Sequence, residues 1–436
     1  MQMVKLFARD FFLPATFWVM RRFRRLTRKG PENEWGIGPA MEKHILILTT
    51  TKDFLWKFEG ENVKTLQHLG YVVHYAANMN EPAYIADNRR LRQMGVRIHH
   101  IDIARSPFLF QENQKALQQV VELIRRYHIQ ALHCHTPVGG LLGRLAGKQC
   151  ADDGVVVIYT AHGFHFYKGA PLLNQLVYYR VEKYLARYTD ILIVINEEDY
   201  RSALKLHLKK GGQIYKIPGV GLDGNKFHPL TEEEYRSCRK ALGIGPRDFF
   251  LVSVGELNGN KNHRIVLEAL AQIRRSGNVP LIRYGVCGDG FFRKRMEDWI
   301  GELGLADIVT LYGYRDDIPA VLGCADASIF PSKREGLGMA GLESLAMGVP
   351  VIAADNRGTR EYMEHEKNGF VYRCDDAAGF AEGIRMMMSL TSAQRAEMKL
   401  RCLDAVKPFR KAYACAVMRR IYTAVTRRIE EADRYG

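Results

Sequence analysis

Two glutamates, Glu335 and Glu343, lie in a stretch (330–355) whose pattern is a strand, a glycine-bearing loop, a helix from about Met339 and a second strand. The first glutamate falls in the loop at the mouth of the helix and the second within the first helical turns, so both can face one ligand. A carboxylate accepts hydrogen bonds from sugar hydroxyls or from a ribose diol. The stretch therefore favours a site for a hydroxyl-rich ligand over the plainer interpretation of a helix cap and a solvated side chain.

The loop between the two glutamates carries Gly336 and Gly338. Glycine lets backbone N–H groups approach a phosphate or sugar closely, and the helix that follows adds the positive end of its dipole. Upstream, VGELNGNKNH (254–263) repeats the arrangement of strand, loop and helix, with Lys261 near the helix start. An ammonium group beside backbone donors can neutralise a diphosphate, although a lone loop lysine is usually a solvated charge.

Histidines gather at the ends of two predicted strands. His162 and His165 follow one of them, where a histidine is more often a structural hydrogen-bonding group than a catalytic one. His133 and His135 share one face of another strand, which suggests a metal, but no third ligand follows at useful spacing. We therefore expect no metal site and interpret His135-Thr-Pro as a motif at the edge of a cleft.

The elements that position these residues alternate between β-branched runs and helical stretches from residue 44 onward. This is the pattern of a parallel sheet covered by helices. The segment 111–127 is predicted to be a helix because its apolar residues recur at three- and four-residue spacing. The predicted strands of this first series are 44–50, 71–78, 96–103, 131–137, 155–163 and 190–196.

A second series of the same design begins at residue 249. Together the two series predict two facing Rossmann-like, doubly wound α/β domains with a cleft at the carboxyl ends of both sheets, followed by a C-terminal crossover helix after Pro408. The segment 216–234 between them is rich in Gly, Pro and charge, as a hinge should be. The predicted divisions are a leader (1–40), an N-terminal Rossmann-like domain (41–220), a hinge (221–245), a C-terminal Rossmann-like domain (246–406) and a basic terminal helix (407–436).

Length and composition fit this organisation. A chain of 436 residues exceeds what one hydrophobic core usually serves, and 47% hydrophobic with 25% charged residues is ordinary for a globular protein. The eight cysteines are scattered and include no CxxC pair. Neither a zinc site nor a disulfide framework is therefore indicated, and a reducing cytoplasm fits.

A net charge of +15 draws the protein toward something anionic, which could be nucleic acid, an acidic membrane surface or a phosphorylated substrate. Part of this charge clusters at 21–29, directly after an apolar run from Phe11 to Met20. That run contains Pro14 and is shorter than the roughly 20 residues that a membrane-spanning helix needs. Most of the positive charge follows the run, whereas in a signal peptide the positive charge precedes the apolar stretch. We expect an interfacial anchor on anionic lipid, with a disordered leader as the alternative.

The glutamate, seven residues, glutamate pattern from Glu335 to Glu343 resembles the signature of the retaining glycosyltransferase family 4, which has the two-domain GT-B fold. The likeness covers roughly residues 44 to 430. It implies that Glu335 lies at the donor sugar, that Glu343 binds the ribose and that Lys261 holds the diphosphate. It also implies that His162 faces the sugar from the opposite domain, since the N-terminal domain (41–220) would be the acceptor domain and the C-terminal domain (246–406) the nucleotide-sugar domain. The loop backbone that would line the sugar and diphosphate is that of Gly336, Leu337, Gly338 and Met339.

One position departs from the family. Glu256 stands where an arginine usually joins the lysine at the diphosphate, so a second cation would have to come from Arg264, Arg315 or Arg360, which the sequence does not rank. The GELN motif with a downstream NKN is closer to a capsule and exopolysaccharide branch of the family. Tyr314 and Arg315 follow a strand at the position where the family receives the nucleotide base, with a surface turn as the alternative.

The expected activity is that of a retaining hexosyltransferase that moves sugar from a nucleotide donor, expected to be a UDP-sugar, to a lipid-linked saccharide. No cofactor or metal is expected, because no Asp-x-Asp motif follows a strand to hold a cation. The expected place is the cytoplasm, at the anionic inner face of the plasma membrane, with no nucleic-acid partner.

The alternatives are a sugar-nucleotide epimerase or phosphorylase of the same architecture, or a basic nucleic-acid-binding protein, for which no recognised motif appears. A nicotinamide oxidoreductase is excluded, because TTTKDF after the first strand has no glycine and GDGFFR (288–293) lacks the third glycine of the fingerprint.

Overall fold

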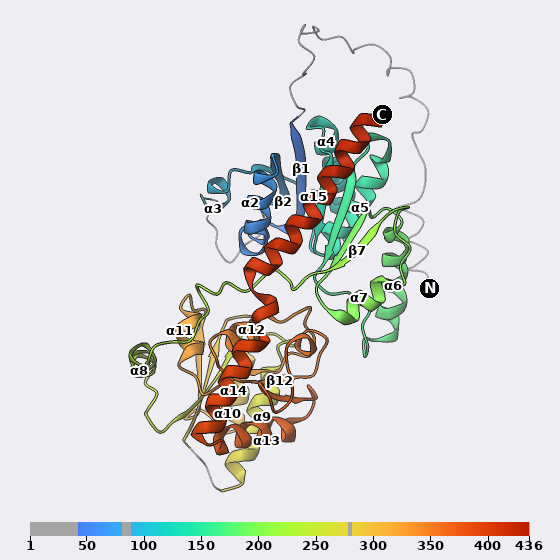
Figure 1. Ribbon diagram of the computed structural model, residues 1–436. Helices are drawn as coiled ribbons and strands as arrows, with labels where there is room; N and C mark the ends of the chain where they lie inside the picture. The colour runs from blue at the N-terminus through green and yellow to red at the C-terminus, as the bar shows by residue number, and fades with distance from the viewer. Residues whose placement is uncertain (1–41, 81–88, 278–280, 436) are drawn as a thin grey trace.

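The β-branched runs form the strands of two parallel sheets, one in each of two domains (Figure 1). The structure is a computed structural model that describes residues 42–80, 89–277 and 281–435, so the predicted leader lies outside the described residues. The first sheet has seven strands in the order β3-β2-β1-β4-β5-β6-β7, and the second has six in the order β10-β9-β8-β11-β12-β13. All neighbouring strands run parallel, and each order reverses at its first strand, which confirms the doubly wound α/β fold.

The elements of the first domain are β1 (Lys43–Thr51), η1 (Leu55–Glu59), α2 (Gly60–His68), β2 (Tyr71–Asn78), α3 (Arg89–Gln93), β3 (Arg97–His100), α4 (Phe110–Arg126), β4 (Ala131–His135), α5 (Pro137–Gln149), β5 (Val156–Ala161), α6 (Leu172–Ala186), β6 (Ile191–Val194), α7 (Glu197–Ala203) and β7 (Gln213–Lys216). Those that follow are α8 (Glu232–Ala241), β8 (Phe249–Val254), α9 (His263–Arg275), β9 (Ile282–Cys287), α10 (Arg293–Glu302), β10 (Val309–Gly313), α11 (Ile318–Gly323), β11 (Ala327–Phe330), α12 (Met339–Ala346), β12 (Val351–Ala354), β13 (Gly369–Tyr372), α13 (Ala377–Ser389), α14 (Ser392–Ala405) and α15 (Lys411–Tyr435).

The central strand β1 shows why the strand sequences are apolar throughout. Ile45 and Ile47 pack into the core on one face of the first sheet, whereas Leu46 and Leu48 belong to the core on the other face. Helices cover both faces of the sheet, so consecutive side chains along the strand are buried, whichever face they point to. The carboxyl ends of the two sheets then remain free to face each other at the junction of the domains.

Two elements differ from the sequence-based expectation. β7 adds a seventh strand at the edge of the first sheet, and its residues are only partly buried or exposed, so it lacks the apolar run that marks the others. α8 lies inside the range expected to be the hinge. Its start is fixed by a capping box between Thr231 and Glu234, a signal that the sequence does contain.

The chain crosses between the domains twice, and the two crossings lie side by side. The N–H of Leu222 donates to the carbonyl of Phe409 (2.7 Å), and the N–H of Lys411 donates to the carbonyl of Leu222 (2.9 Å). Gly221 has a φ of 84°, and a Cβ there would lie 2.6 Å from the Cα of Lys411, so this approach requires glycine.

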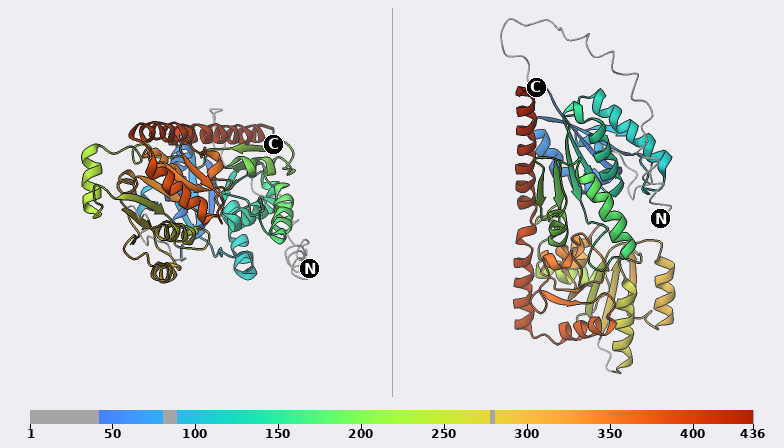
Figure 2. Two further views of the ribbon diagram at one scale, coloured as in Figure 1. Left: turned by 90° about the horizontal axis from the view of Figure 1, so that it is seen from below. Right: turned by 90° about the vertical axis from the view of Figure 1, so that its right-hand side faces the viewer.

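After the second crossing, α15 leaves the C-terminal domain and packs on α2 of the N-terminal domain. Figure 2 shows α14 and α15 following one another along the outside of the molecule. The hydroxyls of Tyr71 and Thr426 lie 3.0 Å apart, and Lys43 donates to Glu430 (2.7 Å). The predicted terminal helix is therefore a structural part of the first domain.

All eight cysteines are free thiols. Among the residues described, no helix combines the length and the apolar character needed to cross a bilayer.

Candidate active site

The loop after β8 is fastened to the loop after β11 by asparagines. Asn258 Oδ1 accepts hydrogen bonds from the backbone N–H groups of Asn260 and Lys261 (both 3.0 Å). Asn260 Nδ2 donates to the carbonyl of Arg334 (2.9 Å). The NGNKN motif is therefore a turn whose side chains hold Lys261 next to the loop that carries Glu335.

Lys261 and Glu335 form an ion pair at the mouth of α12. Lys261 Nζ lies 2.7 Å from Glu335 Oε1, and the two side chains are 22% and 15% exposed. An ammonium group has three N–H donors, so Lys261 can bind a phosphate while it keeps this partner. The structure thus brings together two of the three residues predicted to be catalytic.

Glu343 lies in the second turn of α12. Burial raises its pKa to about 7, although nearby lysines act in the opposite direction. Tyr362 is buried beside both glutamates and donates its hydroxyl to the carbonyl of Gly338 (3.0 Å). Burial, with the charges of Glu335 and Glu343, holds the pKa of Tyr362 well above its ordinary value. Sequence analysis did not find Tyr362, because no motif or spacing marks it.

Close contacts explain the glycines of this loop. A Cβ on Gly336 would lie 2.0 Å from the carbonyl oxygen of His162 across the domain junction. Gly338 has a φ of 87°, and a Cβ there would lie 2.7 Å from a buried ring. Leu337 is buried, so only its backbone can face a ligand, and Met339 begins α12.

His162 stands on the opposite wall, after β5. Its Nε2 lies 3.2 Å from Nδ1 of His135. Burial lowers the pKa of His162 to about 4 and holds the pKa of His135 well below its ordinary value, so both rings are neutral near pH 7. His165 lies against the ring of Tyr178, with 4.8 Å between the ring centres, as a packing residue would.

His133 and His135 meet a third group that sequence spacing could not reveal. Glu59 is buried at the end of η1, 3.6 Å from His135 Nδ1, and the ligand atoms of all three lie within 4.8 Å of one another. Both ring nitrogens of His133 are engaged, with Tyr422 (2.9 Å) and Thr160 (2.8 Å). A metal ion bound to His133 would have to displace one of these two hydrogen bonds, one of which links β4 to α15.

A buried ion pair joins the two walls. Arg357 donates to Asp199 Oδ1 (2.7 Å), with the side chains 4% and 1% exposed, and also to the carbonyl of Glu335 (3.2 Å). Asn196 caps α7 and donates its Nδ2 to the carbonyl of Gly336 (2.9 Å). Burial raises the pKa of Asp199 even though Arg357 acts in the opposite direction. The first two carbonyls of the glycine loop are therefore held by one network that spans the junction.

The remaining predicted contacts lie outside this network. Tyr314 follows β10 and is 63% exposed, and Glu256 is exposed in the loop after β8. Arg264, Arg315 and Arg360, which sequence analysis offered as a second cation, are each already paired with a carboxylate. Their partners are Glu268, Asp317 and Asp355 respectively.

Comparisons with known proteins agree with this two-walled site. Residues 44–196 match the family described as Glycosyl transferase 4-like, and residues 235–401 match Glycosyl transferases group 1. Over 347 residues the chain is 40% identical to EpsD of Bacillus subtilis (strain 168), which is named as a glycosyltransferase; the match covers 80% of this chain and 88% of EpsD. The chain belongs to these glycosyltransferases.

This glycosyltransferase is also similar to proteins whose ligands are named. It is 28% identical over 274 residues to the UDP-Gal:alpha-D-GlcNAc-diphosphoundecaprenol alpha-1,3-galactosyltransferase of Escherichia coli. This match covers 63% of this chain and 70% of that protein. Its fold superposes on Anabaena Alr3699/HepE, solved in complex with UDP and glucose, with a TM-score of 0.70 and 18% identity over 88% of this chain and 100% of that one. The glycosyltransferase therefore has the GT-B fold.

Proposed function

We propose that this glycosyltransferase is a retaining, metal-independent hexosyltransferase that moves a sugar from a UDP-sugar to a lipid-linked saccharide. The observation that carries the proposal is the Lys261–Glu335 ion pair beside a glycine loop and a helix N-terminus. The related structure named with UDP and the relative named for a diphosphoundecaprenol acceptor support the choice of donor and acceptor.

Each residue then has a role that follows from its chemistry. Lys261 and the backbone N–H groups of the glycine loop stabilise the charge of the leaving diphosphate. Glu335 accepts from a sugar hydroxyl, Glu343 accepts from the ribose diol, and His162 offers a neutral hydrogen bond to the sugar from the other wall. The leaving phosphate assists deprotonation of the acceptor on the same face, so the anomeric configuration is kept.

The chemistry can be tested in two steps. Titration calorimetry with UDP, GDP, NAD and single-stranded DNA should show binding of UDP and not of DNA, which separates the proposal from a nucleic-acid-binding function. Transfer from UDP-sugars should then continue in EDTA, and NMR of the early product should show the anomer of the donor. Loss of transfer on chelation with recovery in magnesium, or an inverted product, would refute the site assignment.

We further propose that the protein works at the cytoplasmic face of the plasma membrane in capsule or exopolysaccharide assembly. The basic leader that follows the apolar run from Phe11 to Met20 supports this location. Deletion of residues 1–40 should weaken binding to anionic vesicles and leave UDP binding unchanged. Equal vesicle binding by the full and shortened chains would remove the leader from the proposal.

A further inference from the structure

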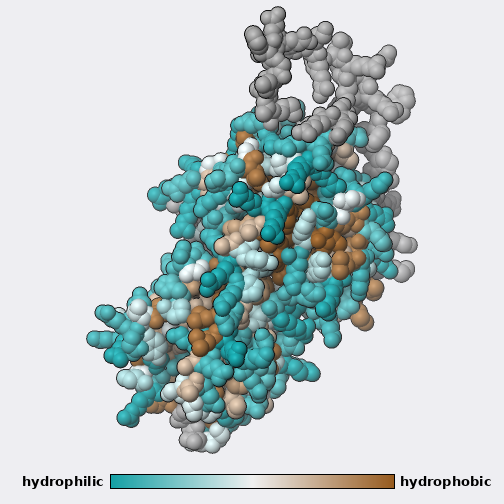
Figure 3. All heavy atoms as spheres, in the orientation of Figure 1, coloured by the Kyte–Doolittle hydropathy of each residue, from teal (hydrophilic) through white to brown (hydrophobic). Residues whose placement is uncertain are grey.

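The outward face of α6 changes character along its length. Its first turns expose large apolar side chains. Further along the same face, exposed lysine and arginine side chains recur at spacings of three and four residues. Figure 3 shows hydrophobic atoms at the surface where Figure 1 draws α6. We call the set the α6 face: Leu172, Leu173, Leu176, Arg180, Lys183 and Arg187.

The apolar end of the α6 face is unusual for a soluble domain. Leu172, Leu173 and Leu176 are 78%, 70% and 57% exposed. A single exposed leucine needs no explanation, but three on adjacent turns form a contiguous patch, and such patches mark interaction surfaces.

α6 presents no acidic side chain of its own at the basic end of the α6 face. Glu182, the only acidic residue of α6, turns inward to the buried Arg144 (2.6 Å). For Arg180, Lys183 and Arg187 we find no carboxylate partner among residues 42–80, 89–277 and 281–435. Glu198, which lines the same groove as Arg180, is already paired with Arg360 (3.4 Å), so this end presents an excess of positive charge to whatever the leucines contact.

The α6 face is also fixed relative to the wall of the site that holds His162. The segment that joins His162 to α6 is held by two acidic residues, because the N–H of Phe164 donates to Asp199 (3.2 Å) and the N–H of Lys168 donates to Glu198 (2.8 Å). A groove of about 430 Å³ runs beside this segment, and its lining includes Tyr167, Leu176 and Arg180. The groove thus connects the α6 face with the segment that follows His162.

We propose that the α6 face docks on an anionic bilayer, with its leucines in the boundary between headgroups and acyl chains and its cations on the lipid phosphates. The inference rests on the proposed function, because a lipid-linked acceptor presents its saccharide at the bilayer surface, where α6 would hold the His162 wall. A second copy of the chain is a poorer occupant, since pairing this face with itself would oppose like charges.

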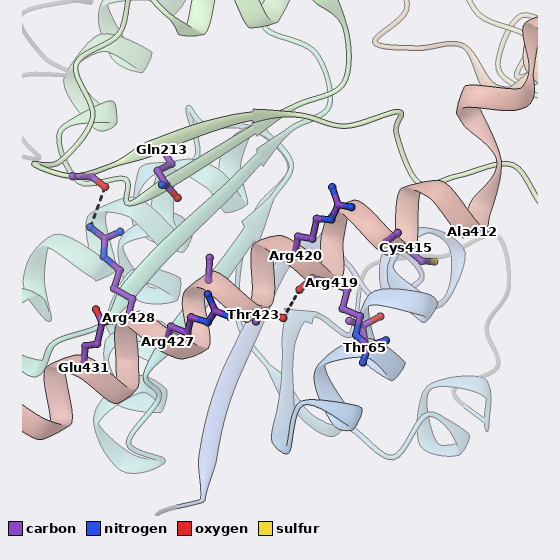
Figure 4. A pocket seen from close by; sticks show the side chains of 13 residues that line it. Thr65, Gln213, Ala412, Cys415, Arg419, Arg420, Thr423, Arg427, Arg428 and Glu431 are labelled. Carbon is purple, nitrogen blue, oxygen red and sulfur yellow. Dashed lines mark hydrogen bonds between the residues drawn. The ribbon is translucent and has the colours of Figure 1, made fainter.

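A second arginine-rich surface offers an internal comparison. Arg419, Arg420, Arg427 and Arg428 line a groove of about 980 Å³ between α15 and β7, which Figure 4 shows from close by. The other described residues of its lining are small or polar, and Arg428 is engaged with the carbonyl of Gly211 (3.2 Å). This groove has charge without large exposed apolar side chains, so it lacks the part that would enter a bilayer.

The first experiment is sedimentation of the full-length protein with vesicles of phosphatidylcholine and phosphatidylglycerol. The triple variant Leu172→Ser, Leu173→Ser, Leu176→Ser should partition about tenfold less, and Arg180→Gln, Lys183→Gln, Arg187→Gln about 100-fold less at low salt. The controls Leu400→Ser, which alters an exposed leucine of α14, and Arg419→Gln, Arg420→Gln, Arg427→Gln should stay within about twofold of the parent protein.

A local measurement separates α6 from any other membrane contact of the chain. The parent's own four tryptophans set the background, and a tryptophan introduced by Leu173→Trp should add quenching by brominated acyl chains in anionic vesicles, whereas one introduced by Leu400→Trp should add none. Absence of quenching at position 173 would overturn the proposal. The proposal would also be overturned if the triple leucine variant bound vesicles like the parent protein but lost self-association, as measured by sedimentation velocity.

The α6 proposal and the proposed function fail in different ways. Both triple variants should bind UDP normally and transfer sugar to an acceptor dissolved in detergent, but transfer less to the same acceptor in vesicles. A parent protein that does not bind UDP would refute the proposed function. Normal UDP binding with vesicle binding indifferent to all six residues would refute only the role of α6.

Discussion

The two walls of the cleft are built in different ways. The C-terminal wall comes from two continuous loops, after β8 and β11, and holds the charged Lys261–Glu335 pair. The N-terminal wall draws on η1, β4 and β5, and its histidines are neutral because they are buried. Under the proposed function, the charged pair on the first wall binds the donor diphosphate, and the neutral histidines on the second wall position the sugar. Substitutions should therefore be most costly on the C-terminal wall.

The largest effect should come from the ion pair itself. Lys261→Ala and Glu335→Ala should each lower turnover by at least ~10²-fold, the scale of losing one preorganised charge contact. Lys261→Ala should also weaken UDP binding in calorimetry, because the diphosphate loses its nearest cation. Lys367→Ala, which removes an exposed lysine paired with Glu364, is the matched control and should leave both values unchanged.

The next largest effect should come from the network that joins the walls. Arg357→Gln should lower the free energy of unfolding by about 3–5 kcal/mol, since it leaves Asp199 buried without its cation. Turnover should fall about tenfold, because the carbonyls of Glu335 and Gly336 lose their common support. Denaturant unfolding and steady-state kinetics measure the two quantities. If the loss of stability in the double variant Arg357→Gln, Asp199→Asn equalled the sum of the losses in the two single variants, the pair would not be coupled.

A smaller effect is expected at the neutral wall. His162→Ala should lower kcat about tenfold, the scale of one hydrogen bond to a neutral group. With a pKa of about 4, His162 stays neutral across the working range, so its loss should leave the pH profile unchanged above about pH 5. His165→Ala is the comparison within the same segment and should change kcat less. A new ionisation in the profile of the His162 variant would contradict this role.

The smallest and most selective effect concerns pH. Because the pKa of Glu343 is about 7, UDP affinity should fall several-fold from pH 8 to pH 6 as the ribose acceptor is protonated. Glu343→Gln should flatten this dependence, whereas Glu59→Gln should not, although Glu59 also has a pKa of about 7. Calorimetry at a series of pH values measures the difference between the two walls.

Stability should respond to both glutamates in the same sense. Each folded-state pKa lies above the ordinary value of 4.5, so the folded protein keeps a proton that the unfolded chain releases. The free energy of unfolding should therefore decrease as pH rises from about 4.5 to about 7, and either glutamine variant should reduce this slope. Equal slopes in the parent and both variants would show that neither carboxyl is desolvated.

Local sequence patterns were enough to predict much of the fold and the C-terminal wall of the site. Period and composition marked the central strands, and strand-loop-helix sequences placed Lys261 and Glu335, whose loops the asparagines then join. On the other wall the resemblance implied a role for His162, but Glu59 could not be predicted, because it reaches His135 only through packing of the first domain. The same holds for Arg357 and Asp199, which are far apart in sequence and belong to no motif that announces their pairing.

The path of α15 has a consequence for how the molecule could be divided. A helix that follows the second domain in sequence completes the surface of the first through Tyr422 and Thr426. An N-terminal fragment ending at the hinge would lack this cover and expose the polar contacts of Tyr71 and His133. A peptide spanning 411–435, supplied separately, should restore this cover, so the first domain by itself should assemble from two pieces that are not adjacent in the sequence, in the manner of split-protein complementation.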